Sequence, residues 1–245
     1  MKRRTFLKMA SALPLFNIGC AGFGHSRAHK IARGAKIRLA LIGCGSRMGH
    51  SVGYGILNEF HEEEIVCICD PDPANRKKVL NTIFARNPSI DVSKIRQYFD
   101  YRQMFEKEAG SLDAAVIATP NHHHALAAVL AMNKGLHVYV EKPMALTVEE
   151  VAMMERAQRA SGAVLQVGNQ GHSSEGMRRF VEFVKAGVFG QIREVWCYCD
   201  RINAMSYRPP AAPPPSGMDW DLWHTTQQFH EFNEKNHPGN WRSWY

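Results

Sequence analysis

The chain has 245 residues, of which 45% are hydrophobic and 22% are charged, a composition typical of a globular protein with one or two domains. Its formal net charge is +7, but nine of its 30 Lys and Arg residues lie within residues 1–38, which contain no Asp or Glu. The rest of the chain carries 21 basic and 23 acidic side chains. This balance argues against a basic surface for nucleic acid.

Residues 1–28 resemble a twin-arginine export signal, in which Arg3 and Arg4 precede Phe-Leu-Lys and a short apolar core. The core is too short and too rich in Gly and Ala to span a bilayer. We expect cleavage at residues 26–28 and a soluble periplasmic product, since proteins that carry such signals are typically exported by the twin-arginine machinery after they have folded. Lipid attachment at Cys20 is the less favoured alternative, because the expected aliphatic residue three positions earlier is missing.

Apolar runs and helical segments alternate through the first two thirds of the chain. Near-continuous apolar strands that alternate with helices predict an α/β fold with a doubly wound parallel sheet. Six strands fit a complete Rossmann domain over residues 36–168. The expected strands are 36–42, 64–69, 98–99, 113–119, 138–140 and 163–167, and the expected helices are 47–60, 74–86, 101–108, 121–134 and 147–162. In this pattern Asn121 caps the fourth helix, and Thr147 with Glu150 forms a capping box for the fifth.

Residues 169–245 are less regular and predict an incomplete α+β substrate domain, the truncated start of a second unit. A helix is expected at 175–186, and the alternating segment 191–200 is expected to be the first strand of a new sheet. A proline-rich stretch at 208–215 interrupts regular structure, and aromatic residues then accumulate from residue 220 onward. One strand cannot form a stable sheet alone, so the second domain is predicted to be unfinished.

The cysteines and the three consecutive histidines do not predict a metal site. The pairs Cys67 with Cys69 and Cys197 with Cys199 lie in strand-like runs, where residues two apart share a face and small apolar side chains pack well. His122 to His124 point about 100° apart on a helix and cannot converge on one ion. Capping, pocket lining and packing are their expected roles.

A glycine-rich turn follows the first predicted strand. Gly43 and Gly45 fit the pattern that brings backbone N–H groups close to a pyrophosphate at a helix N-terminus, although the third glycine, Gly49, falls one position late. Asp70 ends the second strand, where a carboxylate accepts hydrogen bonds from the adenosine ribose and favours NAD over NADP. Arg76 keeps NADP open, because it lies close enough in sequence to meet a 2′-phosphate.

Glu141-Lys142-Pro143 follows the fifth predicted strand, at the edge of the sheet where ligands of such folds bind. Lys142 is there in a position to take the proton of a substrate hydroxyl while hydride leaves the carbon. An ordinary lysine is protonated at neutral pH, but burial or a neighbouring cation such as oxidised nicotinamide lowers a lysine pKa. The same ammonium could instead orient a hydroxyl or carbonyl without changing protonation. A cis peptide bond before Pro143 is expected.

The order of these motifs resembles the glucose–fructose oxidoreductase and inositol dehydrogenase (Gfo/Idh/MocA) family over residues 36 to about 200. The shared segments are the glycine turn, Cys69-Asp70, Asp100-Tyr101, Thr119-Pro120-Asn121-x-x-His124-Ala125, Gly135-x-His137-Val138, Glu141-Lys142-Pro143 and Gln166-Val167-Gly168-Asn169-Gln170. Segments 220–223 and 240–242 also look like those that precede the substrate sheet in exported members.

The resemblance implies an NAD(P)-dependent oxidoreductase that acts on a sugar or polyol, with Lys142 as the catalytic residue. It implies that the cofactor contacts Gly43, Gly45, Ser46, Arg47, Asp70, Thr119, Pro120, Asn121, His124, Glu141, Lys142 and Gln170. Members usually carry a later Asp-x-Gly-x-His-x-x-Asp-like stretch that completes the catalytic group, and this sequence has none. Two alternatives therefore stay open: an exported glycosidase that uses NAD transiently, and a non-catalytic nucleotide-binding remnant. Family members often form oligomers through the substrate sheet.

Overall fold

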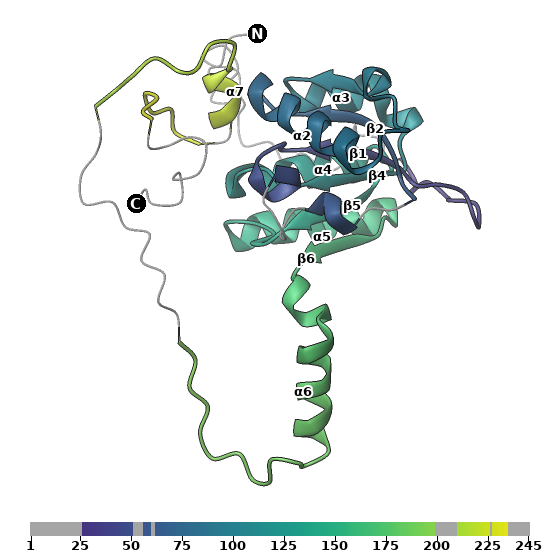
Figure 1. Ribbon diagram of the computed structural model, residues 1–245, viewed down its shortest axis with the longest axis vertical. Coiled ribbons are helices and arrows are strands. Elements are labelled where there is room, and N and C mark those ends of the chain that lie inside the picture. Colours follow the sequence, from purple (N-terminus) through teal and green to yellow (C-terminus); the bar gives the residue numbers. More distant parts are fainter. Residues whose placement is uncertain (1–25, 51–55, 60–61, 199–209, 226, 235–245) are drawn as a thin grey trace, which may run out of the picture.

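The computed structural model describes residues 26–50, 56–59, 62–198, 210–225 and 227–234. Its centre is a sheet of six strands in the order β3-β2-β1-β4-β5-β6, and every pair of neighbours is parallel (Figure 1). The strands are β1 (Arg38–Ile42), β2 (Glu64–Cys69), β3 (Arg96–Tyr98), β4 (Ala114–Ile117), β5 (His137–Glu141) and β6 (Leu165–Gly168). This order confirms the predicted doubly wound Rossmann sheet, in which the direction of winding reverses between β1 and β4.

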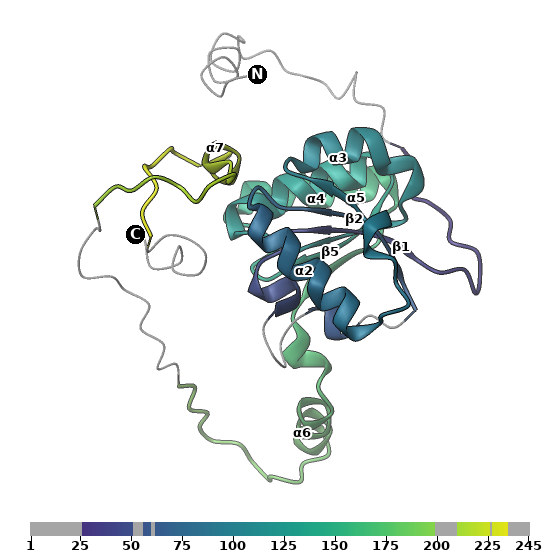
Figure 2. The same cartoon turned by 45° about the horizontal axis from the view of Figure 1, so that its top comes forward.

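Alternate residues of the buried strands serve two separate cores. Leu39, Leu41 and Ile68 pack with Val79 and Ile83 on one face, whereas Ala40, Ile42 and Cys67 belong to the core on the other face. Figure 2 shows α2 (Pro73–Arg86) on the first face and α3 (Tyr101–Glu108), α4 (His124–Asn133) and α5 (Val148–Ser161) on the second. Because side chains of a strand alternate between faces, burial on both sides explains the continuous apolar runs.

Side-chain caps determine where several helices begin. Asp72 accepts a hydrogen bond from the backbone N–H of Ala74 at the start of α2, which satisfies one of the free donors of the first turn. At the start of α5 the predicted capping box is confirmed: Thr147 accepts from the N–H of Glu150, and the Glu150 carboxylate accepts from the N–H of Thr147. These caps fix the strand-to-helix turns near the carboxyl ends of β2 and β5.

Four local predictions are wrong. The helix expected at 47–60 is a π turn at Ser46–His50 and a 3₁₀ turn at Ile56–Glu59, with residues 51–55 and 60 outside the described part. Asn121 does not cap a helix, because a 3₁₀ turn begins at Asn121 itself and α4 starts only at His124.

The other two concern the segment after α6 (Glu175–Lys185). Residues 191–198 form no strand, and residues 199–200 lie outside the described residues. An alternating pattern needs a neighbouring strand to form a sheet, and none of the described residues supplies one there. Cys197 is accordingly exposed rather than packed in a core, and Cys199 is not described, whereas Cys67 and Cys69 are buried as predicted.

The amino ends of the strands are closed by hydrogen bonds. Arg38 at the start of β1 forms a two-point ion pair with Asp113 just before β4, with N–O distances of 3.0 and 2.8 Å. Residues 26–29 lie along the same edge: the N–H of Ala28 donates to the Ser161 carbonyl at 2.8 Å, and the N–H of His29 donates to the Gly135 carbonyl at 3.0 Å. Polar groups at this edge are thus satisfied by other groups of the protein.

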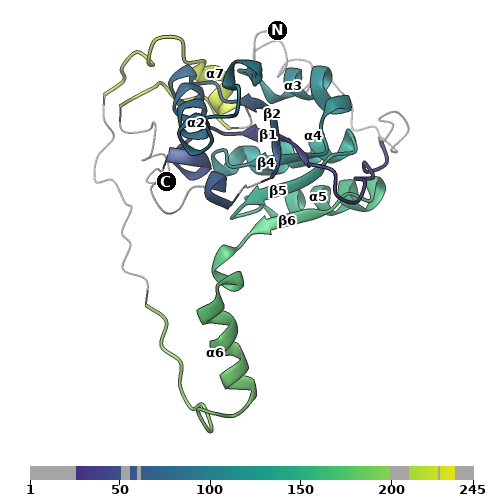
Figure 3. The same cartoon turned by 45° about the vertical axis from the view of Figure 1, so that its right-hand side comes forward.

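Two segments follow the sheet. Helix α6 extends away from the sheet and has no buried residue, as Figures 1 and 3 show. Residues 210–225 contain the short helix α7 (Trp220–His224), which returns to the carboxyl side of the sheet and forms a small aromatic core with Phe232. No helix among the described residues is long and apolar enough to cross a membrane.

Candidate functional site

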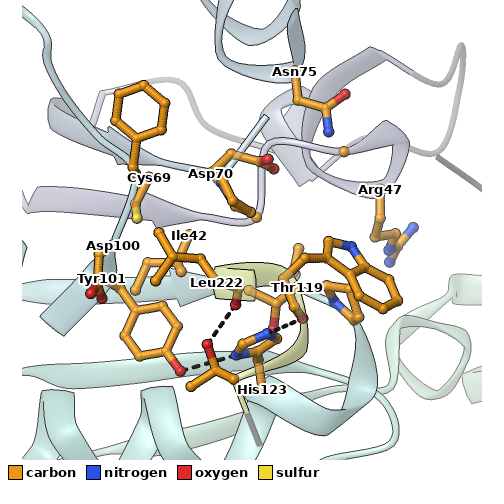
Figure 4. A pocket seen from close by; sticks show the side chains of 18 of the residues that line it. Ile42, Arg47, Cys69, Asp70, Asn75, Asp100, Tyr101, Thr119, His123 and Leu222 are labelled. Carbon is orange, nitrogen blue, oxygen red and sulfur yellow. Dashed lines mark hydrogen bonds between the residues drawn. The ribbon is translucent and has the colours of Figure 1, made fainter. Parts of the chain in front are cut away.

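A cavity opens at the carboxyl ends of β1, β2 and β4, where the direction of winding of the sheet reverses. Its empty volume, including its open mouth, is about 940 Å³. Figure 4 shows Asp70 and Asn75 on one side of this cavity and Thr119, His123 and Leu222 on the other. Ligands of open α/β sheets bind at this type of position.

The glycine turn forms the floor of the cavity, and Gly43 is required there for two reasons. Its φ is +84°, a conformation that side chains disfavour, and a Cβ atom would lie 2.5 Å from the backbone nitrogen of Thr119. The ends of β1 and β4 therefore approach more closely than any other residue would allow. A Cβ atom on Gly45 would meet no atom within 4 Å, so the cavity is open beside that residue.

Asp70 connects the glycine turn to the end of β2. One carboxylate oxygen accepts a hydrogen bond from the Cys44 N–H at 2.7 Å, and the other accepts from the Asp72 N–H at 2.8 Å. A carboxylate of this kind can accept hydrogen bonds from ligand hydroxyls. The side chain lines the cavity and is largely buried, so it presents a fixed negative charge there.

Arg76 lies behind this carboxylate and not along the cavity. Its guanidinium donates to the backbone carbonyl of Asp70 and stacks over the Phe99 ring, with its central carbon 3.8 Å from the ring centroid. The side chain is buried, with 5% of its surface exposed. Arg76 therefore stabilises the β2 exit and does not line the cavity.

The β4 exit carries buried polar atoms without partners in the part of the chain that the structure describes. Thr119 Oγ1 and Asn121 Oδ1 are buried and have no hydrogen-bond partner among the described residues. Buried polar groups are normally satisfied, so such orphans mark a place where a ligand completes the hydrogen bonding. His124 lies between the carbonyl oxygens of Thr119 and Pro143, at 3.0 and 2.6 Å, and thereby ties the β4 exit to the β5 exit.

A polar cluster surrounds Glu141 at the end of β5. Its Oε1 accepts hydrogen bonds from Arg47 at 2.8 Å, from Gln170 at 2.6 Å and from the Tyr139 hydroxyl at 3.2 Å. Burial alone would raise the pKa of Glu141, but the hydrogen bonds from Arg47 and Gln170 outweigh it and hold the pKa below its usual value. Glu141 is therefore a carboxylate that fixes Arg47 beside the glycine turn and is unsuited to act as a general acid.

Lys142 follows this cluster directly. Its side chain is exposed, and its peptide bond to Pro143 is cis, as predicted. It is not among the residues that line the cavity. Lys142 leaves the sheet beside the β4 exit, since β5 pairs with β4 and the adjacent His124 contact holds Pro143 to Thr119.

The structure thus brings together most of the predicted site. Gly43, Gly45, Ser46, Arg47, Asp70, Thr119 and Pro120 line the cavity, whereas Asn121, His124, Glu141, Lys142 and Gln170 lie next to it without lining it. His123 lines the cavity, one of the roles expected for the three histidines, and other lining residues were not predicted as part of the site: Asn75, Phe99, Asp100, Tyr101, Leu222, Trp223 and Thr225. Asp100 and Tyr101 belong to a shared motif, and Leu222 and Trp223 belong to the segment 220–223, so the sequence held a signal for these four residues.

Residues 37–169, more than half of the chain, match a family described as an oxidoreductase family with an NAD-binding Rossmann fold, GFO_IDH_MocA. The chain belongs to the Gfo/Idh/MocA family. A protein of Shewanella baltica named glycosyl hydrolase family 109 protein is 29% identical over 209 residues, which cover 78% of this chain and 44% of that protein. A protein of the same name from Shewanella woodyi is 29% identical over 193 residues, covering 77% and 39%.

Two solved structures of sugar-related dehydrogenases share the Gfo/Idh/MocA nucleotide-binding fold with this chain. The WlbA dehydrogenase from Bordetella pertussis, in complex with NADH and UDP-GlcNAcA, is 29% identical with a TM-score of 0.53, covering 66% of this chain and 43% of that one. The myo-inositol 2-dehydrogenase from Lactobacillus plantarum is 26% identical with a TM-score of 0.52, covering 64% and 43%. The chain spans less than half the length of the curated relatives it matches.

The residues present fit NAD, the cofactor of this family. The open space beside Gly45 suits a diphosphate next to backbone N–H groups, and the Asp70 carboxylate suits the ribose hydroxyls. The orphaned Thr119 and Asn121 oxygens suit a ligand that brings its own donors. When bound, NAD supplies the hydride acceptor.

Proposed function

We propose that this chain is the nucleotide-binding part of an NAD-dependent oxidoreductase that acts on a sugar or polyol by hydride transfer. The observation that carries the proposal is the cavity between Gly43, Asp70 and Thr119, with Lys142 at the exit of the adjacent strand. The cavity gives the dinucleotide a fixed position. The neighbouring β5 exit is then where a substrate would meet the protein.

In this proposal Lys142 handles the substrate proton. As hydride leaves a carbon of the substrate, the proton of the attached hydroxyl passes to the lysine amine and a carbonyl forms. The exposed position of Lys142 leaves its amine accessible to a substrate. Glu141 and Arg47 do not transfer protons in this proposal. Their ion pair, with an N–O distance of 2.8 Å, connects the glycine turn after β1 to the end of β5.

We propose NAD rather than NADP as the preferred cofactor. The Asp70 carboxylate faces the cavity and would repel a 2′-phosphate. Arg76, the cation nearest in sequence, is held by the Asp70 carbonyl and Phe99. The test is the ratio of the dissociation constants of NADH and NADPH, which we expect to favour NADH at least tenfold. Equal affinities would contradict this preference.

A glycosidase that uses NAD without net consumption is the second candidate. The observation that favours it is the name shared by the relatives from Shewanella baltica and Shewanella woodyi, glycosyl hydrolase family 109 protein. The same nucleotide site and the same lysine would serve it, because the lysine would accept the proton when a ring hydroxyl is oxidised and return it when the hydroxyl is restored. No net NADH would then accumulate.

One experiment separates these candidates. The purified chain, and separately any longer product of the same gene, is mixed with NAD and a panel of sugars, polyols and aryl glycosides. Accumulation of NADH with a free sugar or polyol supports the dehydrogenase, and release of aglycone without NADH supports the glycosidase. NAD binding without turnover of any substrate, in both forms, identifies a non-catalytic nucleotide-binding protein. If neither form binds NAD or NADP, the proposal fails.

Lys142→Ala tests the catalytic assignment. We expect turnover to fall at least a hundredfold while the NADH dissociation constant changes less than threefold, because proton transfer contributes about 10²–10⁴-fold to rate. Lys94→Ala, at an exposed lysine outside the cavity, is the matched control and should leave both quantities unchanged. A large loss of NADH affinity in the Lys142 variant would contradict the assigned role.

We also propose export by the twin-arginine pathway to the periplasm. The hydrogen bonds of residues 26–29 to the amino edge of the sheet support processing before Ser26 rather than at residues 26–28, since cleavage there would remove two of these donors. The mass of the mature N-terminus from a periplasmic fraction tests this. A mature chain that begins at His29 would contradict early processing, and a protein confined to the cytoplasm would contradict export. A diacylglyceryl group on Cys20 would instead identify lipid anchoring.

A further inference from the structure

One wall of the cavity comes from a segment far away in the sequence. Leu222, Trp223 and Thr225 line the same space as Gly43 and Asp70, although about 150 residues separate the two groups. These wall residues belong to the segment 217–225, which contains α7 and is called the strap below. Figure 4 shows Leu222 of the strap on the same side of the cavity as Thr119 and His123.

The strap is attached at its first end to the β2 exit. The backbone N–H of Asp219 donates to the carbonyl of Pro71 at 3.2 Å, directly after the Asp70 carboxylate. Gly217 packs so tightly that a Cβ atom there would lie 3.3 Å from the Pro73 ring. These contacts place the beginning of the strap beside the residue that is suited to the adenosine ribose.

The second end of the strap is attached to the β4 exit by two histidines. The Nε2 atoms of His122 and His123 each lie 2.8 Å from the carbonyl oxygen of Trp223. Both nitrogens must donate, because a carbonyl oxygen only accepts and has two lone pairs. The other nitrogen of His123 then accepts from the Tyr101 hydroxyl at 3.0 Å, which fixes its tautomer. Both histidines are buried, so this double attachment is shielded from water.

The strap is also held internally. Asp219 caps α7 by accepting from the Leu222 N–H at 2.9 Å, and the Trp220 and Trp223 rings stack with centroids 4.6 Å apart. The Trp220 indole N–H donates to the His230 carbonyl at 2.8 Å. A rigid aromatic segment of this kind keeps its position over a ligand at little cost in side-chain entropy.

We infer that the strap closes over the adenosine half of the dinucleotide and retains it between turnovers. The strap spans the cavity from the β2 exit to the β4 exit, so a bound dinucleotide cannot leave on that side without release of at least one attachment. This inference rests on the proposed function, since it assumes that the cavity holds NAD. A retained cofactor suits a reaction cycle without net redox change, in which the hydride that is removed is later returned.

The test is the rate at which bound NADH leaves the full chain, measured from the decay of NADH fluorescence after a chase with excess NAD. We expect Leu222→Ala and Trp223→Ala each to accelerate release at least tenfold, because each removes part of the wall. Trp223→Phe should restore most of the slow release. Asp221→Ala is the matched control: it changes an exposed residue of the same helix and should release NADH at the wild-type rate.

Thermal unfolding of each variant accompanies these rates, because Trp223 also belongs to the small aromatic core. The inference is overturned if the folded Leu222→Ala variant releases NADH as slowly as the wild type. In that case NADH binding by the wild-type chain still supports the proposed function, and only the inference that the strap retains the cofactor is rejected. Absence of NADH binding by the wild-type chain would overturn both.

Discussion

The amino and carboxyl edges of the central sheet differ in how their polar groups are satisfied. At the amino edge, the Arg38–Asp113 pair and the hydrogen bonds of residues 26–29 satisfy the polar groups with other protein groups. At the carboxyl edge, Gly43 adopts a positive φ, while buried oxygens of Thr119 and Asn121 have no hydrogen-bond partner in the described part of the chain. The difference shows that protein groups complete the hydrogen bonding at one edge, while the other leaves open space and polar groups that a ligand can complete.

Of the substitutions that test this difference between the edges, the one at Gly43 is expected to have the largest effect on stability. Gly43→Ala should lower the free energy of unfolding by more than about 3 kcal/mol, because it adds a positive-φ penalty to a clash with the backbone of Thr119. Urea unfolding measures this change. Gly45→Ala is the matched control: it has room for the methyl group and should stay within about 0.5 kcal/mol.

The same control variant tests binding. Because the added methyl group of Gly45→Ala occupies the space assigned to the diphosphate, NADH affinity should fall at least tenfold in a fully folded protein. If Gly45→Ala binds NADH normally, the diphosphate lies elsewhere. If Gly43→Ala is as stable as the wild type, the close approach of β1 and β4 is not required.

A smaller effect is expected at Asp70. Asp70→Asn should weaken NADH binding about 10- to 100-fold, since hydrogen bonds to a charged group contribute about 1.5–3 kcal/mol. It should also reduce the preference for NADH over NADPH, because the charge that repels a 2′-phosphate is gone. Fluorescence titrations with both nucleotides measure the two constants. An unchanged preference would show that Asp70 does not discriminate between them.

The buried histidines of the β4 exit predict a dependence of stability on pH. Burial, with a further contribution from His122, lowers the pKa of His123 to about 3. The unfolded chain therefore binds more protons below the ordinary histidine pKa, and stability should fall as pH decreases from about 6.5 toward 3. The loss should be on the order of 1 kcal/mol per pH unit, which urea unfolding at pH 7 and pH 5 measures. His123→Phe should show a shallower slope, and an identical slope would contradict the assignment.

The smallest effect is expected at the amino edge. Asp113→Ala removes the acceptor of the Arg38 pair and should cost about 1 kcal/mol of stability, because the Arg38 side chain is 39% exposed and its ion pair is partly screened. NADH affinity should stay within twofold of the wild type. A large change in affinity would show that the two edges are coupled and not separate.

The sequence predicted those parts of the fold that depend on local patterns. The strand order, the capping box of Thr147 and Glu150, and the cis bond before Pro143 each follow from local sequence, and the structure confirms them. Gly43 and Asp70 were likewise predictable, because each occupies a fixed position relative to a strand end.

The remaining site residues depend on contacts between distant segments. Trp223 reaches the cavity because His122 and His123 bind its carbonyl, and no periodic pattern connects residues a hundred positions apart. Asn121 resembled a helix cap, but a 3₁₀ turn occupies residues 121–123 and delays the helix. Residues 191–198 alternate like a strand, yet pairing depends on a partner that a single segment does not encode.

Hydrogen–deuterium exchange with and without saturating NAD tests the central claim most directly, because it observes both edges of the sheet in one sample. We predict that NAD slows exchange in the glycine turn, after Asp70 and around Thr119, and leaves residues 26–29 and 112–113 unchanged. Saturating NAD with no protection of the glycine turn, or with protection only at the amino edge, would contradict the claim that the carboxyl-edge cavity holds the cofactor.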